Sequence, residues 1–192
     1  MNGKIFFISG PSGVGKGTLI DFLRKKYSDA WVFPPSCTTR DPRPGEKEGE
    51  TYFFISLEEF EKRIAAGDFL EYAQVHNGHF YGTLRHKLVD PAEKEGKVVI
   101  REFDVQGFDQ ARKKLPRDLY VSIFLKPFES IDYLMERIRK RAPISDEETK
   151  KRAESMNREM QMSHIYDHIL ISREGEQLRL VDDFEALVLQ YQ

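Results

Sequence analysis

The feature that most constrains this chain is a glycine-rich segment with a lysine at its end, running from Gly10 to Lys16. An apolar run at residues 5–8 precedes it, and a segment of helical periodicity at 16–27 follows it. Glycines let successive backbone N–H groups point at one anion, and the N-terminus of a helix adds partial positive charge. A lysine at this spacing reaches the outer phosphates of a nucleoside triphosphate. The segment therefore predicts a phosphate-binding loop for ATP or GTP.

Composition and charge exclude several other classes of protein. The 192 residues are 40% hydrophobic and 32% charged, and no stretch approaches the roughly 18 apolar residues of a membrane-spanning helix. A formal net charge of −2 disfavours bulk attraction to nucleic acid or to an anionic membrane. The single cysteine, Cys37, excludes a disulfide framework and fits a reducing compartment. We expect a cytoplasmic protein with no nucleic-acid or membrane partner, and its oligomeric state stays open.

Apolar runs and helical periods alternate along the chain. Strands are expected at residues 4–9, 31–36, 69–75, 97–104, 120–125 and 168–171. Helices are expected at 16–27, 56–66, 84–95, between 104 and 120, at 130–162 with an interruption at 142–143, and at 181–190. The helix at 84–95 should break near Pro91 or begin after it, because proline lacks the backbone N–H. Ser56 and Ser145 each precede a glutamate by three residues, which is typical of a helix start.

This alternation predicts an α/β fold, a parallel sheet covered by helices on both faces. Ligands of such folds bind beyond the C-terminal ends of the strands. Two excursions, at residues 36–84 and 126–162, depart from the alternation and are expected to overhang that edge. The layout is that of a kinase with a substrate flap and a helical lid.

The first excursion contains residues that could bind a second, phosphorylated substrate. Arg40 and Arg43 lie in a proline-stiffened loop, and a guanidinium group can bind phosphate through two parallel N–H bonds. Tyr52 could add a hydroxyl donor. Composition alone would favour a solvated surface loop. Glu71, within an apolar strand, is either an edge residue that faces water or a hydrogen-bond acceptor for a ligand.

Together these segments resemble guanylate kinase over about residues 4–171. The likeness is carried by the phosphate-binding loop, by residues 36–46 with Gly49 and Tyr52, and by the motifs at 71–73, 81–83 and 102–107. The resemblance implies transfer of the terminal phosphate of ATP to GMP, with Mg²⁺, and use of dGMP as well. It also implies one domain with three parts, which are a P-loop core (1–35, 85–125, 163–192), a GMP-binding subdomain (36–84) and a lid (126–162).

The resemblance also implies roles for individual residues. The residues implied to bind ATP are Gly10, Pro11, Ser12, Gly13, Val14, Gly15, Lys16, Gly17 and Thr18. Those implied to bind GMP are Ser36, Arg40, Arg43, Tyr52, Glu71, Tyr81, Thr83, Glu102 and Asp104. The implied catalytic charges are Lys16, Arg40, Arg137, Arg141 and Arg152, the last three in the lid. Glu71 would accept hydrogen bonds from the guanine N1–H and amine, which adenine does not offer in the same pattern.

Two positions depart from the expected pattern. Gly17 stands where the Walker motif has Ser or Thr, so Mg²⁺ has no firm direct protein ligand, and Thr18 and Asp104 are the candidates. Arg101 stands where an apolar strand residue is expected, and it either pairs with a carboxylate or reaches a phosphate.

Two other functions compete with the phosphotransferase. One is a guanylate-kinase-like module that binds peptides without catalysis, but such modules typically have a degraded phosphate loop, and Lys16 is intact. The other is a P-loop kinase for a different acceptor, which would have no evident use for the trio Ser36, Glu71 and Thr83.

Overall fold

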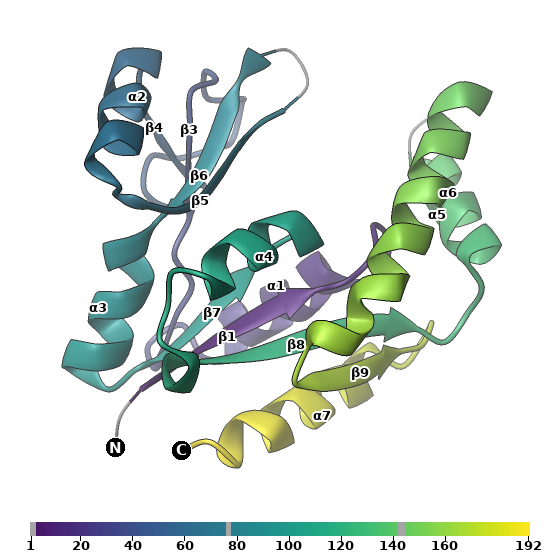
Figure 1. Ribbon diagram of the computed structural model, residues 1–192. Helices are drawn as coiled ribbons and strands as arrows, with labels where there is room; N and C mark the ends of the chain where they lie inside the picture. The colour runs from purple at the N-terminus through teal and green to yellow at the C-terminus, as the bar shows by residue number, and fades with distance from the viewer. Residues whose placement is uncertain (1–2, 76–77, 142–144) are drawn as a thin grey trace.

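The computed structural model describes residues 3–75, 78–141 and 145–192, without the side chains of Arg137, Lys140, Arg141 and Asp146. Figure 1 shows a central sheet with helices on both faces, a lobe containing a second sheet on one side, and a pair of helices on the other. No helix of this described part is both long and apolar enough to cross a membrane.

The central sheet has five parallel strands. In spatial order they are β2 (Trp31–Val32), β7 (Val98–Glu102), β1 (Lys4–Ser9), β8 (Tyr120–Pro127) and β9 (His168–Ser172). Strand β1 is in the middle, and alternate residues of it are buried on opposite faces. Ile5 and Phe7 belong to one apolar cluster, and Phe6 and Ile8 to the other. Burial on both faces explains why β1 is an uninterrupted apolar run.

Four helices cover this sheet. Helices α1 (Lys16–Lys26) and α7 (Gln177–Leu189) pack on the face of Phe6 and Ile8. The opposite face carries α3 (Arg85–Glu95) and α4 (Val105–Arg112). Burial of each large apolar side chain in these layers contributes about 1.5–3 kcal/mol to the free energy of unfolding, relative to the same side chain left exposed. The two helical layers leave the C-terminal edge of the sheet for loops.

The lobe at residues 36–84 contains a separate four-stranded sheet. In spatial order its strands are β4 (Tyr52–Phe54), β3 (Ser36–Thr38), β6 (Phe80–Leu84) and β5 (Phe69–Gln74). Helix α2 (Leu57–Ala66) packs on it through Phe60, whose ring stacks on Phe69 at 4.3 Å between centroids. The predicted start of this helix is confirmed, because Ser56 Oγ accepts a hydrogen bond from Glu59 N.

The helical pair on the other side consists of α5 (Ile131–Arg141) and α6 (Asp146–Gln161). A small apolar cluster that includes Leu134, Ile138 and Met156 joins the two helices. Ser145 Oγ accepts from Glu148 N, which confirms the predicted start of α6. The interruption expected at residues 142–143 lies outside the described residues. Two short 3₁₀ turns, Arg117–Leu119 and Met162–Ile165, lead into β8 and β9.

Two expectations about secondary structure are wrong. Residues 31–36 do not form one strand, because β2 and β3 belong to different sheets and Pro34 and Pro35 lie between them, where their missing N–H groups interrupt pairing. Helix α3 neither breaks nor begins at Pro91. Burial of Leu88 and Ala92 offsets the roughly 3 kcal/mol that an interior proline costs.

The phosphate-binding loop packs tightly against β8, and this contact gives a test of the fold. A Cβ added to Gly10 would lie 2.4 Å from the carbonyl oxygen of Leu125, and its φ is +150°. We expect Gly10→Ala to lower the free energy of unfolding by about 2 kcal/mol or more, measured by urea denaturation. Gly17→Ala is the matched control, since no heavy atom would lie within 4 Å and alanine favours helix by up to about 1 kcal/mol. Equal midpoints for Gly10→Ala and the unmodified protein would contradict this packing.

Candidate active site

The segment 10–15 forms a loop whose backbone is shaped to surround an anion. Gly10, Gly13 and Gly15 all have positive φ, at 150°, 82° and 108°. Gly15 is the N-cap of α1 and no side chain caps that helix end, so its first N–H groups are available to a ligand. The free helix end and the curled loop together provide partial positive charge for phosphate.

Lys16 lies at the edge of this loop. Its Nζ donates to the carbonyl oxygen of Gly10 at 2.6 Å and to that of Pro11 at 3.2 Å. Glu102 Oε1, at the end of β7, is 3.8 Å from the same ammonium group. Only 13% of the Lys16 side chain is exposed, so its charge is held in place beside the loop. This geometry suits contact with the outer phosphates of a nucleotide.

Arg40 is buried in the lobe of the second sheet and is held by several partners. Its Nη1 and Nη2 each donate to one carboxylate oxygen of Glu46, both at 2.6 Å, and Nε donates to Tyr81 Oη at 2.9 Å. Nη1 also donates to the carbonyl oxygen of Asp41. Since a guanidinium has five N–H groups, these described contacts leave one on Nη2. Glu46 thus sets the direction of Arg40.

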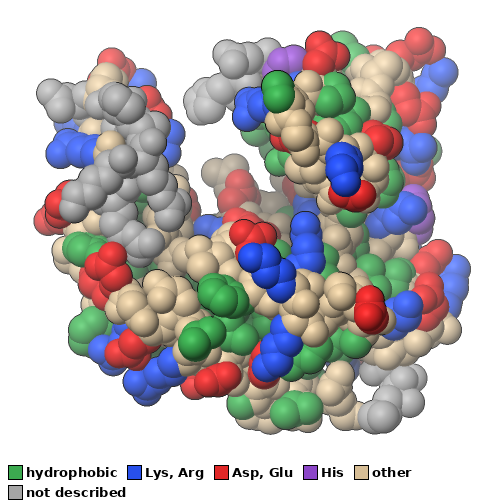
Figure 2. Space-filling view, turned by 180° about the vertical axis from the view of Figure 1, so that it is seen from behind, with side chains coloured by type: hydrophobic (Ala, Val, Ile, Leu, Met, Phe, Trp, Pro, Cys, Tyr) green, Lys and Arg blue, Asp and Glu red, His purple; other side chains and the backbone are tan. Residues whose placement is uncertain are grey.

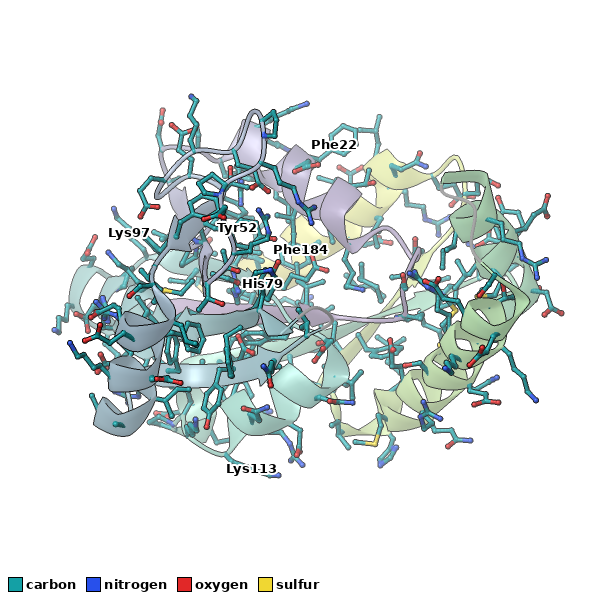
Figure 3. All side chains as sticks on the ribbon, turned by 90° about the horizontal axis from the view of Figure 1, so that it is seen from above. Phe22, Tyr52, His79, Lys97, Lys113 and Phe184 are labelled. Atoms are coloured by element: carbon teal, nitrogen blue, oxygen red, sulfur yellow. The ribbon has the colours of Figure 1, made fainter. Side chains whose placement is uncertain are left out.

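Aromatic rings complete the surroundings of Arg40. Its guanidinium lies 5.0 Å from the ring centroid of Tyr52, and Tyr52 meets Tyr81 edge to face at 5.8 Å. In the view from above, Tyr52 lies inward from the edge of the molecule (Figure 3). Arg43 is exposed on the loop nearby. The structure therefore brings Arg40, Tyr52 and Tyr81 together, and Arg43 lies exposed at the edge of this group.

The side chains expected to contact guanine also lie together. Thr83 Oγ1, on β6, donates to Glu71 Oε1, on β5, at 2.6 Å. Burial raises the pKa of Glu71 above its usual value of 4.5, while the Thr83 hydrogen bond and the charge of Arg101 oppose that shift. Ser36 begins β3, and Arg101 donates to both its Oγ and Thr83 Oγ1. A partly buried carboxylate is thus oriented beside two hydroxyl groups.

Helix α4 fixes the strand that carries Glu71. The side-chain amide of Gln110 pairs with the backbone of Tyr72 in both directions, N to Oε1 and Nε2 to O, each at 3.3 Å. A Cβ added to Gly107 would lie 3.5 Å from Glu71 Oε2, so the carboxylate faces the first turn of α4. Asp104 caps that turn, since its Oδ1 accepts from Gly107 N at 2.6 Å. Asp104 is exposed, and so is Glu102.

A cleft of about 650 Å³ separates α4 from α6 and is lined by residues that include Asp104, Asp109, Ser155 and Glu159. Burial raises the pKa of Glu159, although Ser155 donates a hydrogen bond to its carboxylate. Seen from behind, the two lobes rise on either side of a hollow above the sheet (Figure 2).

The three arginines expected in the lid fall on α5 and α6. Arg152 is paired with Glu148 one turn before it, at 2.6 Å. The side chains of Arg137 and Arg141 lie outside the described residues, although both positions are within α5.

The candidate metal ligands are separate oxygen donors. Thr18 is exposed on the first turn of α1, and Asp104 uses one oxygen to cap α4. Hydroxyl and carboxylate oxygens suit Mg²⁺, which usually takes one or two protein ligands and keeps several waters. No group of three His, Cys, Asp or Glu side chains within the described ranges could hold a metal ion. The donor set fits an ion bound mainly by phosphate and water.

A phosphate-binding loop at the carboxyl edge of a parallel sheet, facing a second lobe with an oriented arginine and carboxylate, defines a P-loop nucleotide-binding protein of the kinase type. The family model described as guanylate kinase matches residues 2–178, and the chain belongs to this family.

Curated relatives and a solved structure agree with this family. A guanylate kinase from Campylobacter jejuni (strain RM1221) is 43% identical over 188 residues, which are 97% of this chain and 87% of the relative. One from Thermotoga maritima is 41% identical over 176 residues, 92% and 82% of the two chains. The crystal structure of guanylate kinase from Anaplasma phagocytophilum matches with a TM-score of 0.71 at 28% identity, covering 100% of this chain and 87% of that one.

The sequence assigned no role to Glu46 or Gln110, and for Arg101 it predicted a carboxylate or a phosphate as partner, whereas the hydrogen bonds of Arg101 within the described part of the chain go to a backbone carbonyl and two hydroxyl groups. Glu46 orients Arg40, Gln110 anchors the strand of Glu71, and Arg101 joins Ser36 to Thr83. In each case one side chain contacts residues that are between 6 and 67 positions away in the sequence. The only available signal was that Arg101 interrupts an apolar strand.

The pair of Arg40 and Glu46 predicts a pH dependence of stability. Hydrogen bonds from the Arg40 side chain and the Arg43 backbone lower the pKa of Glu46 from 4.5 to about 2. A lowered pKa means that the stabilisation is complete above about 4.5 and is lost as pH falls towards 2. We expect the difference in melting temperature between the unmodified protein and Glu46→Gln to narrow as pH falls from about 6 to about 3. A difference that stays constant over this range would contradict the shift.

Proposed function

We propose that this chain transfers the terminal phosphate of ATP to GMP, giving ADP and GDP, and that dGMP serves as a second acceptor. The observation that carries the proposal is the partly buried Glu71 carboxylate, which Thr83 orients at 2.6 Å in the lobe that also holds Arg40. Such a carboxylate can accept two hydrogen bonds from the guanine N1–H and amine. AMP offers a lone pair at N1 and no amine at that place, so it would give the Glu71 carboxylate no donor beyond Thr83, which is costly for a partly buried charge.

The phosphate of GMP is proposed to bind at the rim of the same lobe. Arg40 and Arg43 would supply the charge, and Tyr52 and Tyr81 would supply hydroxyl donors. The remaining N–H of Arg40 can meet a phosphate oxygen while Glu46 still holds the rest of the fork. Binding both ends of GMP in one lobe would fix the acceptor oxygen relative to the phosphate-binding loop.

ATP is proposed to bind along residues 10–18, with the backbone N–H groups and Lys16 on its phosphates. Phosphoryl transfer needs positioning and charge stabilisation more than covalent chemistry by the protein. Arg152 would leave Glu148 and turn to the phosphates when α5 and α6 close, joined by Arg137 and Arg141 from the lid. Closure would also exclude water that could otherwise hydrolyse ATP.

Mg²⁺ is proposed as the companion of ATP, where it supplies charge neutralisation between the phosphates. Thr18 and Asp104 are the protein groups proposed to contact the ion or its water shell.

The division into a P-loop core, a GMP-binding subdomain at 36–84 and a lid at 126–162 is proposed from the family resemblance and from the placement of the two lobes. A cytoplasmic location is consistent with the single, buried Cys37.

Replacement of Lys16 tests the phosphate-binding loop. We expect Lys16→Ala to lower kcat by about 100-fold or more, the usual size for loss of one charge-stabilising group, while GMP binding stays nearly unchanged. Lys26→Ala is the control, since Lys26 lies at the other end of the same helix, where it pairs with Glu185 of α7 and lies over the ring of Tyr27. Steady-state kinetics and calorimetric titration with GMP give the two readouts. Undiminished turnover in Lys16→Ala would overturn the ATP site.

Replacement of Glu71 tests base recognition. We expect Glu71→Gln to lower kcat/KM for GMP by about 10- to 100-fold and to narrow the preference over AMP, because a charged acceptor is lost. Because burial raises the pKa of Glu71, GMP affinity should begin to fall with decreasing pH above 4.5. Glu71→Gln should lack this part of the pH dependence of GMP affinity. The difference between the two proteins is independent of the protonation of GMP itself, which affects both equally. Unchanged selectivity in the variant would refute the role of Glu71.

The proposal as a whole is tested by ADP release from ATP and Mg²⁺ with GMP, dGMP, AMP, CMP and UMP offered separately. Turnover with GMP and dGMP and little with the others would support it. If no acceptor works and ATP still binds, a kinase for another acceptor gains support. Failure to bind ATP at all would favour a non-catalytic binding module.

A further inference from the structure

Arg101 lies at the junction of the two sheets. It is on β7, opposite Phe7 in the register of the central sheet, and its side chain reaches the second sheet. Nη1 donates to the carbonyl oxygen of Pro34 at 2.8 Å, just before β3 begins. Nη2 donates to Ser36 Oγ on β3 and to Thr83 Oγ1 on β6, the latter at 2.7 Å. One guanidinium thus touches both strands through which the chain enters and leaves the lobe.

These contacts decide which way the two hydroxyl groups point. Each hydroxyl has one hydrogen to donate, and at both groups Arg101 occupies a lone pair of the oxygen. The hydrogen of Thr83 goes to Glu71 Oε1. The hydrogen of Ser36 points away from Arg101, and the oxygen keeps one lone pair, so this hydroxyl is held in place with a hydrogen and a lone pair left for a ligand. The result is a hydroxyl fixed by Arg101 near a carboxylate acceptor that Thr83 orients.

This arrangement matches guanine and opposes adenine. The Watson–Crick edge of guanine has an acceptor at O6 and donors at N1 and the 2-amine, whereas adenine has a donor amine at position 6 and an acceptor at N1. The fixed Ser36 hydroxyl can donate to O6 of guanine, but its second lone pair could also accept from the 6-amine of adenine, so discrimination between the bases rests on the Glu71 carboxylate. This carboxylate meets the two guanine donors.

A buried arginine in this strand is expected to lower the stability of the protein, which calls for a function that an apolar residue could not serve. Burial lowers the pKa of Arg101, its Nε has no partner within the described part of the chain, and its guanidinium lies over the ring of Phe103 at 5.4 Å. Replacing a buried charge by a well-packed apolar residue is often neutral or stabilising. An apolar side chain here could support β7 but could not orient either hydroxyl.

We propose that Arg101 is a positioning residue for base selectivity, which holds the hydroxyl groups of Ser36 and Thr83 in place and, through Thr83, the carboxylate of Glu71. The inference rests on the proposed phosphorylation of GMP and extends it to a residue that touches neither substrate. Arg101 acts through the two hydroxyl groups.

Arg101→Leu and Arg101→Lys test the proposal, with Arg63→Leu as a matched control. Arg63 is a partly buried arginine of the same lobe that pairs with Glu59 and Asp68, away from the base site. We expect Arg101→Leu to raise KM for GMP about 10-fold and to lower the ratio of kcat/KM for GMP over AMP by a similar factor, with KM for ATP within about twofold. Lysine keeps the positive charge but not the forked geometry of the guanidinium. The KM for GMP and the selectivity of Arg101→Lys should therefore lie between those of the unmodified protein and of Arg101→Leu, and this variant serves as the test if the leucine variant does not fold.

A second comparison separates orientation from a merely structural role. In a Ser36→Ala or Thr83→Val background, Arg101→Leu should reduce GMP selectivity by a smaller factor than in the unmodified protein, because a hydroxyl that it orients is gone. If the factors by which the two substitutions reduce selectivity simply multiply in the double variant, the inference is overturned. An equal rise in KM for GMP and ATP would also overturn it. So would an effect no larger than that of Arg63→Leu. Absence of GMP turnover in the unmodified protein would instead overturn the proposed function, and both failures are read from the same assay.

Discussion

The parallel pairing of β1 with β7 on one side and β8 on the other is the constraint on which the rest of the structure depends. Parallel strands end at one edge, so the phosphate loop after β1 and the acidic residues at the end of β7 must meet there. Glu102 Oε1 lies 3.8 Å from Lys16 Nζ for this reason, although the two are far apart in sequence. The helical pair begins just beyond β8, at the same edge.

Three cations assigned to the proposed site contact acceptors of the protein itself. Lys16 donates to loop carbonyl groups, Arg40 to Glu46, and Arg152 to Glu148. Lys16 and Arg40 are largely buried, where an unpaired charge is costly, so their contacts lower the free energy of the protein before phosphates arrive. In the proposed function, substrate phosphates would replace the exposed contact of Arg152 more easily than the buried one of Arg40. The lobe would then provide a fixed site, and the helical pair a movable one.

The sequence predicted the segments whose signal is local. The glycine loop, the capping serines at 56 and 145 and the buried run of β1 all follow from neighbouring residues, and the structure confirms them. The short strands β3, β4 and β6 were not predicted as elements, because each has five residues or fewer and depends on pairing with segments far along the chain. The continuous α3 was also missed, since its stability comes from packing of Leu88 and Ala92.

The sequence by itself determined the phosphate loop, the α/β class and the kinds of side chain proposed to bind guanine and phosphate, because motif spacing and residue type are local properties of the chain. Only the tertiary structure decided that Glu46 orients Arg40, that Gln110 anchors the strand of Glu71, and that Arg101 joins Ser36 to Thr83. Hydrogen bonds of this kind need a donor and an acceptor within about 3 Å in the right direction. Spacing along the chain does not specify such contacts when the partners come from different sheets or helices.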